Sequence, residues 1–225
     1  MALQVIHEDN HLLAVAKPAG LLVQGDASGH PTLLEEAREY LRIKYAKPGN
    51  VYLGLVHRLD RNVSGLVLLA RTSKAAGRLS GQFRDGTVRK TYLAVVAGRP
   101  AAPDGILRAH LAAKGDEDGV TRARAGPFPG SREGVLEYRV RESAGGLSLL
   151  EVHPVTGRRH QIRAQLALIG CPLLGDVKYG SERRLADRRI ALHALALEVA
   201  HPVGGVPLRL VCEPPSDWPW PQEPI

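Results

Sequence analysis

Charged residues crowd into one short stretch of the chain, VHRLDRNVSG, at residues 56 to 65. Asp60 lies between Arg58 and Arg61 and follows a run of apolar residues. If this stretch is extended, Arg58 and Asp60 point to one face and Arg61 to the other. Neighbouring cations favour an ionised carboxylate, which suits a nucleophile or an electrostatic stabiliser better than a general acid. The alternative is an ordinary ion pair at a strand end, without a chemical role.

A second stretch, RKTYLAVVAG, places an aromatic side chain among cations. Tyr92 follows Arg89 and Lys90 in a segment whose β-branched residues predict a strand. A tyrosine among cations is suited to stacking on a nucleic-acid base while phosphates are held near by. The alternative is a core or half-buried tyrosine with a packing role only.

A third stretch, HPVTGRRHQIRAQLA, concentrates basic groups where a helix is expected to begin. The helical spacing runs over RRHQIRAQLALIG and ends at Gly170, and its first turns carry Arg158, Arg159, His160 and Arg163. Positive groups oppose the macrodipole at a helix N-terminus unless an anion lies there. We therefore expect a phosphate or carboxylate partner, with a solvated basic face as the open alternative.

The composition of the chain narrows its class. Its 30 Lys and Arg exceed its 23 Asp and Glu, and the net charge of +7 favours a polyanion, nucleic acid before an anionic membrane surface. Cys171 and Cys212 are too far apart in sequence to suggest a disulfide framework or a cysteine zinc site. No HExxH spacing and no phosphate-binding glycine loop is found, so we expect no metal and no cofactor. Because neither a signal peptide nor a membrane-length apolar run is seen, we expect a cytoplasmic protein.

The pattern of apolar and turn residues predicts an α+β fold with a mixed, mainly antiparallel β-sheet and flanking helices. Thr32 and Glu35 form the capping box of one helix, and Ser73 caps a second that ends at Asp85-Gly86. Strands are expected on both sides of an Asp9-Asn10 turn, in VYLGLVHRL and LVLLA, over RKTYLAVVA, on both sides of Ala144-Gly145-Gly146, and in LHALALEV and VPLRLVC.

We find no linker in the sequence and expect a single domain over residues 1–225, with a core over about residues 5–202. Residues 115–134, rich in glycine, proline and charge, are expected to form a long loop or loose hairpin of unassigned role. The Pro-rich tail at 213–225 is expected to lay its two tryptophans against the body of the protein.

Five pieces of the chain, in order, resemble the RluA-type pseudouridine synthase family. HRLDRNVSGLVLLAR resembles the HRLDxxTSG signature, and RKTYLAVVAG resembles the tyrosine-bearing segment of the family. HPVTGRRHQIRAQLALIGCPLLGDVKYG is similar to the TGRxHQIR…GD..YG stretch, LHALALEVAHP to a later strand, and KPAGLLV to the KPxG segment. His57 favours the RluA type over the RsuA type, where glycine usually stands.

The resemblance implies a pseudouridine synthase catalytic domain with a central active-site cleft. Its expected activity is isomerisation of a specific uridine to pseudouridine in structured RNA, ribosomal RNA slightly before tRNA, with base flipping and without metal or cofactor. By matching position, three residues are expected to be catalytic. Asp60 is the nucleophile, Tyr92 stacks on the target base or abstracts the proton, and Arg163 pairs with Asp60. The resemblance also assigns Arg58 to opening the RNA stack.

Three further residues are expected to contact the substrate: Arg61, Arg159 and His160. The chain departs from the family pattern at Val63 and Arg159, where threonine is usual. The KPxG segment begins at Lys17, so we expect no N-terminal RNA-binding domain, and we expect a monomer. Two other functions stay open: a catalytically silent RNA-binding or ribosome-assembly protein, and a nucleosidase or glycosidase that would need a second carboxylate.

Overall fold

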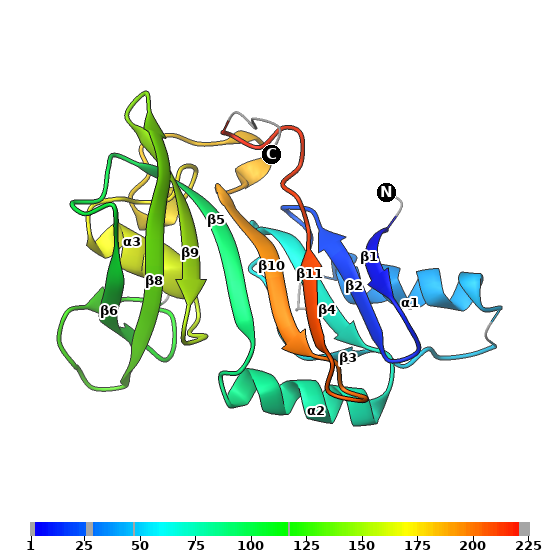
Figure 1. Ribbon diagram of the computed structural model, residues 1–225. Helices are drawn as coiled ribbons and strands as arrows, with labels where there is room; N and C mark the ends of the chain where they lie inside the picture. The colour runs from blue at the N-terminus through cyan, green and yellow to red at the C-terminus, as the bar shows by residue number, and fades with distance from the viewer. Residues whose placement is uncertain (1–2, 26–28, 47, 117, 221–225) are drawn as a thin grey trace. The chain divides into compact units, whose positions relative to one another are not determined.

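The computed structural model describes residues 3–25, 29–46, 48–116 and 118–220. The chain groups into two compact units, here called the first unit (Met1–Arg89 and Ala194–Glu213) and the second unit (Lys90–His193 and Pro214–Ile225). Strands dominate the described part of both units and helices are few, so the fold is α+β, as the sequence predicts (Figure 1). The expectation of a single domain over 1–225 stays a prediction.

The first unit is built on a sheet in the order β1-β2-β4-β10-β11, with β3 also paired to β4. Every residue of β4 is buried, which explains its unbroken apolar sequence. On one face, Leu66 and Leu68 of β4 pack with Ala75 and Leu79 of helix α2. The strands are β1 (Gln4–Glu8), β2 (Leu12–Lys17), β3 (Gly54–Leu55), β4 (Ser64–Ala70), β10 (Leu192–Ala200) and β11 (Pro207–Val211).

The two helices of the first unit begin at hydroxyl caps. Helix α1 (Leu33–Lys44) starts with the predicted capping box: the Glu35 amide donates to Thr32 Oγ1 at 3.2 Å, and the Thr32 amide donates to Glu35 Oε2 at 2.9 Å. For helix α2 (Ser73–Arg84), the prediction that Ser73 is the N-cap is wrong. Thr72 has the extended backbone of a cap and accepts from the Ala75 amide, so Ser73 is the first helical residue.

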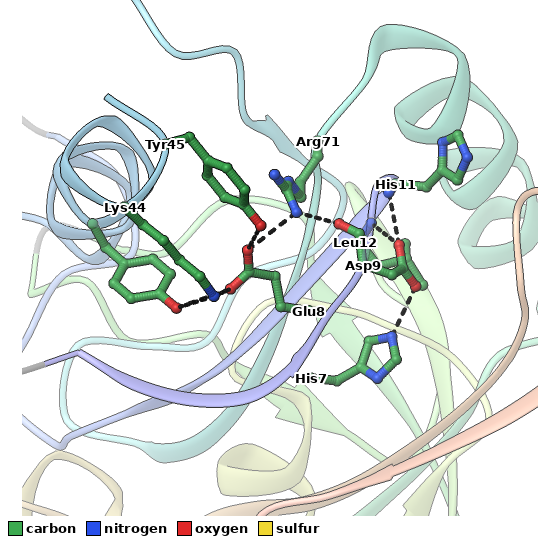
Figure 2. A network of polar contacts seen from close by, with 9 residues as sticks. His7, Glu8, Asp9, His11, Leu12, Lys44, Tyr45 and Arg71 are labelled. Carbon is green, nitrogen blue, oxygen red and sulfur yellow. Dashed lines mark hydrogen bonds and ion pairs between the residues drawn. The ribbon is translucent and has the colours of Figure 1, made fainter. Parts of the chain in front are cut away.

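Glu8, at the end of β1, joins the N-terminal hairpin to helix α1 (Figure 2). Its carboxylate accepts from Lys44 Nζ at 2.7 Å, Tyr45 Oη at 2.5 Å and Arg71 Nη1 at 3.2 Å, and its side chain is 8% exposed. Burial opposes ionisation, but hydrogen bonds from Lys44 and Tyr45 outweigh it and lower the pKa of Glu8 to about 2. The next residue, Asp9, forms the predicted turn by accepting from the amides of His11 and Leu12.

Strand β3 is much shorter than the strand predicted over VYLGLVHRL, and that prediction is wrong for residues 51 to 53 and 56 to 59. Strand β2 pairs along one edge of β4, from Leu12 opposite Ala70 to Lys17 opposite Gly65. Strands β3 and β10 must share the other edge of β4, so β3 pairs only with Leu69 and Ala70. Beyond Leu55 the chain therefore leaves the sheet and runs as an irregular loop.

The second unit is an antiparallel sheet in the order β5-β9-β8-β6-β7. Gly145 and Gly146 connect β8 and β9, both with positive φ, as the predicted tight hairpin requires. The 115–134 region contains a two-residue strand, β7, paired with β6. The strands are β5 (Arg89–Ala97), β6 (Asp104–Ala112), β7 (Ala123–Arg124), β8 (Ser131–Ala144) and β9 (Leu147–Pro154), and the 3-10 turns are η1 (Val177–Tyr179) and η2 (Ala186–Arg188).

Helix α3 (Gln161–Leu168) is shorter than predicted and begins three residues later. It lies against the sheet of the second unit, where Gln165 Nε2 donates to the Leu107 and Gly134 carbonyls at 2.9 and 3.0 Å. The tail closes a separate cluster of this unit. Trp220 is buried with Val95, Leu174 and Ala191, as expected of the tail.

Candidate active site

Asp60 lies in the irregular loop that connects β3 to β4 in the first unit. The apolar side chains on either side of it, Leu59 and Val63, are 8% and 2% exposed and anchor the loop in the core. Asp60 itself is half-buried, and its carbonyl accepts from the Val63 amide at 3.1 Å. Arg58 and Arg61 are exposed. The loop thus carries a sheltered carboxylate with an exposed guanidinium on each side in sequence.

The buried side chain of Lys17 holds this loop in place. Lys17 was not among the site residues predicted from the sequence. It is 1% exposed, and its Nζ donates to the carbonyls of Pro18, Leu21 and Arg61 at 2.9, 2.8 and 3.0 Å. The Gly20 amide also donates to the Arg61 carbonyl, and Arg61 Nε donates back to the Gly20 carbonyl. The KPAG segment and the Asp60 loop are therefore held together by hydrogen bonds that converge on Arg61, through both its carbonyl and its side chain.

The ionisation of Lys17 reflects two opposing effects. Burial lowers its pKa to about 7, and the negative charge of Asp60 acts against that fall. Lys17 and Asp60 consequently interact electrostatically within the first unit. The sequence did contain a signal for this role: Lys17 directly continues the apolar strand LLAVAK. A lysine that is buried at the end of such a strand requires a specific partner.

Gly65, at the start of β4, determines how closely β10 approaches the strand that follows the Asp60 loop. A Cβ placed on Gly65 would lie 2.4 Å from the Ala194 carbonyl oxygen, and its φ of +120° disfavours any side chain. The Ser-Gly end of the motif is therefore explained by backbone packing in the first unit. It fixes where the chain leaves the loop, whereas Lys17 holds the loop at Arg61, the residue after Asp60.

Arg163 belongs to the second unit and is buried in the first turn of α3. Its Nε and Nη2 donate to Asp176 Oδ2 and Oδ1 at 2.7 and 2.9 Å, a bidentate pair whose carboxylate is 2% exposed. Its guanidinium also lies 4.7 Å from the ring centre of Tyr179. Asp176 is thus a carboxylate partner of the kind expected at this helix start, and it was missed as a site residue.

The segment before α3 is held by Gln161 and Tyr179. Gln161 Oε1 accepts from the Arg158 amide and from Thr156 Oγ1 at 3.0 and 2.7 Å, which ties the segment before α3 to the first residue of the helix. His160 takes a left-handed φ of 50°, and its Nδ1 shares a hydrogen bond of 2.9 Å with Tyr179 Oη. The basic residues predicted to lie in the first turn therefore precede the helix, except for Arg163.

Tyr92 also lies in the second unit, as do Arg159 and His160, which are predicted to contact the substrate. Arg159 is exposed, and its Nη2 donates to the Gly119 carbonyl at 3.2 Å. Tyr92 is half-buried in β5, opposite the fully buried Val152 of β9. Burial raises the pKa of Tyr179, beneath Arg163, although the Thr121 amide and the Arg163 charge act against this rise.

The structure therefore places the predicted residues in two groups. Asp60, Arg58 and Arg61 share one loop of the first unit, and Tyr92, Arg159, His160 and Arg163 lie in the second unit. The pairing of Asp60 with Arg163, the stacking role of Tyr92 and the RNA contacts of the other residues stay predictions.

Within the described ranges, no group of three or more His, Cys, Asp or Glu side chains could hold a metal ion. Over the same ranges, no helix is both long enough and apolar enough to cross a membrane. Cys171 and Cys212 are both buried, and no disulfide joins them.

Comparison with known proteins gives a consistent family. Residues 11–168 match a family model described as RNA pseudouridylate synthase. The chain is 35% identical to the ribosomal large subunit pseudouridine synthase D of Zymomonas mobilis, over 96% of this chain and 70% of that protein. It is 33% identical to the ribosomal large subunit pseudouridine synthase C of Vibrio cholerae, over 88% of this chain and 61% of that protein.

Solved structures agree with the sequence matches. The human RNA pseudouridylate synthase domain containing 4 aligns with a TM-score of 0.79 and 25% identity, over 96% of this chain and 90% of that one. The mitochondrial pseudouridylate synthase RPUSD4 of Xenopus tropicalis is 34% identical over 94% of this chain and 77% of its own length.

Proposed function

We propose, because this chain belongs to the RluA-type family of RNA pseudouridylate synthases, that it isomerises a specific uridine in structured RNA with Asp60 as its nucleophile. Isomerisation breaks the bond between ribose C1′ and uracil N1 and forms a bond between C1′ and C5. The proton lost from C5 is balanced by one gained at N1. The reaction therefore needs no external reactant, and we propose that the protein uses no cofactor.

The setting of Asp60 is the observation that carries this proposal. A nucleophilic carboxylate must be held in place and kept ionised while it is shielded from water. Asp60 is half-buried between two core side chains, Leu59 and Val63, and interacts electrostatically with the buried Lys17. A surface ion pair would require neither anchors in the core nor a buried lysine.

Arg163 is proposed as the cation that pairs with Asp60 during the reaction. Its bidentate bond with Asp176 uses Nε and Nη2, so the orientation of the guanidinium plane is fixed by a buried carboxylate. The ring of Tyr179 supports the same plane from one side. An arginine held in this way loses little conformational freedom when it binds a further carboxylate.

Tyr92 is proposed to stack on the target base after it has left the RNA helix. Flipping a base out of its stack costs about a few kcal/mol and is easiest in loops. Stacking on an aromatic side chain returns about 1–3 kcal/mol per base, and basic residues contribute by binding phosphates. We propose Arg58, Arg61, Arg159 and His160 as those RNA contacts, because Arg58, Arg61 and Arg159 are exposed and His160 is partly exposed.

Ribosomal RNA is the proposed substrate, ahead of tRNA. The relatives from Zymomonas mobilis and Vibrio cholerae carry names that refer to the large ribosomal subunit. We also propose that the chain acts as a monomer in the cytoplasm.

Pseudouridine mapping tests the reaction. Carbodiimide-dependent stops of reverse transcription are compared in RNA from a wild-type strain, a deletion strain, and a deletion strain that expresses the Asp60→Asn variant. We expect at least one stop to disappear on deletion and to stay absent with Asp60→Asn. Asp85→Asn, which changes an exposed carboxylate at the end of α2, is the matched control and should restore the stop.

Binding measurements separate catalysis from structure. The Asp60→Asn protein should fold normally and bind RNA within several-fold of wild type. Identical stops in wild-type and deletion RNA would leave a silent RNA-binding protein as the better description. Release of free uracil would instead indicate a nucleosidase.

A further inference from the structure

Lys90 stands in β5 two residues before Tyr92. Residues separated by two positions in a strand point to the same face, about 7 Å apart. Lys90 is half-buried, as Tyr92 is. The ammonium of Lys90 therefore shares the face of the sheet that presents the proposed stacking ring.

The side chain of Lys90 reaches the loop in front of α3. Its Nζ donates to the Thr156 carbonyl at 3.3 Å, and in the described part of the chain this is the single hydrogen bond that its three donors make. Thr156 is itself fixed, since its Oγ1 donates to Gln161 Oε1 at 2.7 Å. The long bond leaves most of the hydrogen-bonding capacity of the ammonium unused.

No carboxylate of the described residues pairs with this ammonium. The nearest acidic residue along β9, Glu151, lies on the opposite face of the sheet, because it alternates with Val152, which faces Tyr92. Glu151 is moreover engaged by Arg141 and by His153 Nε2. The titratable group that shares this face is Tyr92, whereas His153, which also alternates with Val152, lies with Glu151 on the other face and contacts the Lys90 carbonyl and Thr91 Oγ1 there.

A sheltered cation without a counter-ion is unfavourable until an anion arrives. Burial alone lowers the pKa of Lys90, and no carboxylate acts in the other direction. An anionic ligand would remove this cost. RNA carries one phosphate for each nucleotide, and a lysine binds a phosphate as a compact point charge.

We propose that Lys90 binds an RNA phosphate at or next to the nucleotide whose base stacks on Tyr92. The inference rests on the proposed function in assigning that base to Tyr92. Its second support is local: the same strand face carries the ring and the ammonium without a carboxylate partner, on residues whose backbone positions lie about 7 Å apart. The ligand class is a phosphodiester of single-stranded or everted RNA.

The salt dependence of RNA binding tests this inference. Affinity for a fluorescent oligouridylate is measured over a series of KCl concentrations for wild type, Lys90→Gln and Lys90→Arg. Loss of one phosphate contact should reduce the slope of log affinity against log salt by about 0.7. We expect this reduction for Lys90→Gln, which keeps a donor toward the Thr156 carbonyl, and an unchanged slope for Lys90→Arg.

The control is Lys74→Met, which removes an exposed lysine at the start of α2. Its slope should equal that of wild type; an equal loss in both variants would show a general charge effect and overturn the inference. Should Lys90 only tether the loop, Lys90→Gln would leave the slope unchanged, and that result also refutes the proposal. If Lys90→Gln does not fold, Lys90→Met takes its place with the same expected slope.

The outcome is independent of turnover, because oligouridylate binding requires no isomerisation. A protein that forms pseudouridine but shows no slope change would refute only the role of Lys90. A slope change in a protein that forms no pseudouridine would refute the proposed reaction and leave a phosphate-binding lysine in an RNA-binding protein.

Discussion

Replacing Lys17 with methionine should change how stability depends on pH. The methionine keeps the length and apolar character of the stem but removes the ammonium that donates to three carbonyls. In the folded protein burial lowers the pKa of Lys17 from 10.5 to about 7. Between these values the unfolded chain binds a proton at this position that the folded chain has lost.

The sign and size of the effect follow from proton linkage. Where the unfolded state holds more protons, stability rises with pH, by about 1.4 kcal/mol per pH unit for one group. The contribution of Lys17 is therefore fully present above pH 10.5 and is lost as the pH falls to about 7. Over that window the difference between wild type and Lys17→Met should grow in favour of wild type by several kcal/mol.

Denaturant unfolding of both proteins at a series of pH values measures this difference, and subtraction cancels the other groups that titrate in this range. Lys74→Met serves as the control, since Lys74 is exposed and should show a difference that does not vary with pH. A wild-type to Lys17→Met difference that is flat between pH 7 and pH 10 would show that Lys17 is not buried as described. At constant pH, Lys17→Met should also lower isomerisation by at least about tenfold, because three carbonyls near Asp60 lose their donor.

Three other substitutions have definite expected results. Glu8→Gln should lower the free energy of unfolding by about 2–3 kcal/mol at neutral pH, and the difference should vanish as acid protonates Glu8 below pH 4.5 toward about 2, measured by acid unfolding. Gly65→Ala should cost about 3 kcal/mol or more in chemical unfolding, because its Cβ meets the Ala194 backbone; a neutral result would contradict the close approach. Arg163→Lys should abolish isomerisation and lower thermal stability, since lysine cannot form the bidentate bond with Asp176, and full activity in that variant would argue against the proposed role.

Local signals in the sequence predicted the parts of the fold that local chemistry determines. The capping box of Thr32 and Glu35 and the hairpin at Gly145 and Gly146 are confirmed because each depends on residues within a few positions of one another. The cap of α2 was misplaced by one residue, since Thr72 and Ser73 carry the same hydroxyl and only backbone geometry distinguishes them.

Features that depend on contacts between distant segments could not be predicted from local sequence patterns. The shortness of β3 follows from competition with β10 for one edge of β4, which no local pattern encodes. The partner of Arg163 was not foreseen, because Asp176 lies thirteen positions further along the chain and is brought near by the turn after α3. Lys17 was missed because an isolated lysine after an apolar strand is usually exposed.

The chain passes from one unit to the other at residues 89–90, 193–194 and 213–214, so neither unit is a continuous piece of sequence. Strand β11 and Cys212 complete the first unit, while Trp220, a few residues later, fills a cluster around Val95 and Leu174. Removing the Trp220 side chain would consequently leave a cavity in the unit that carries Arg163, although Trp220 stands only a few residues beyond the unit that carries Asp60. Because each unit consists of two separate stretches of the chain, dividing the protein at one position cannot yield either unit intact. Fragment studies of this enzyme would need to join the two stretches of one unit directly.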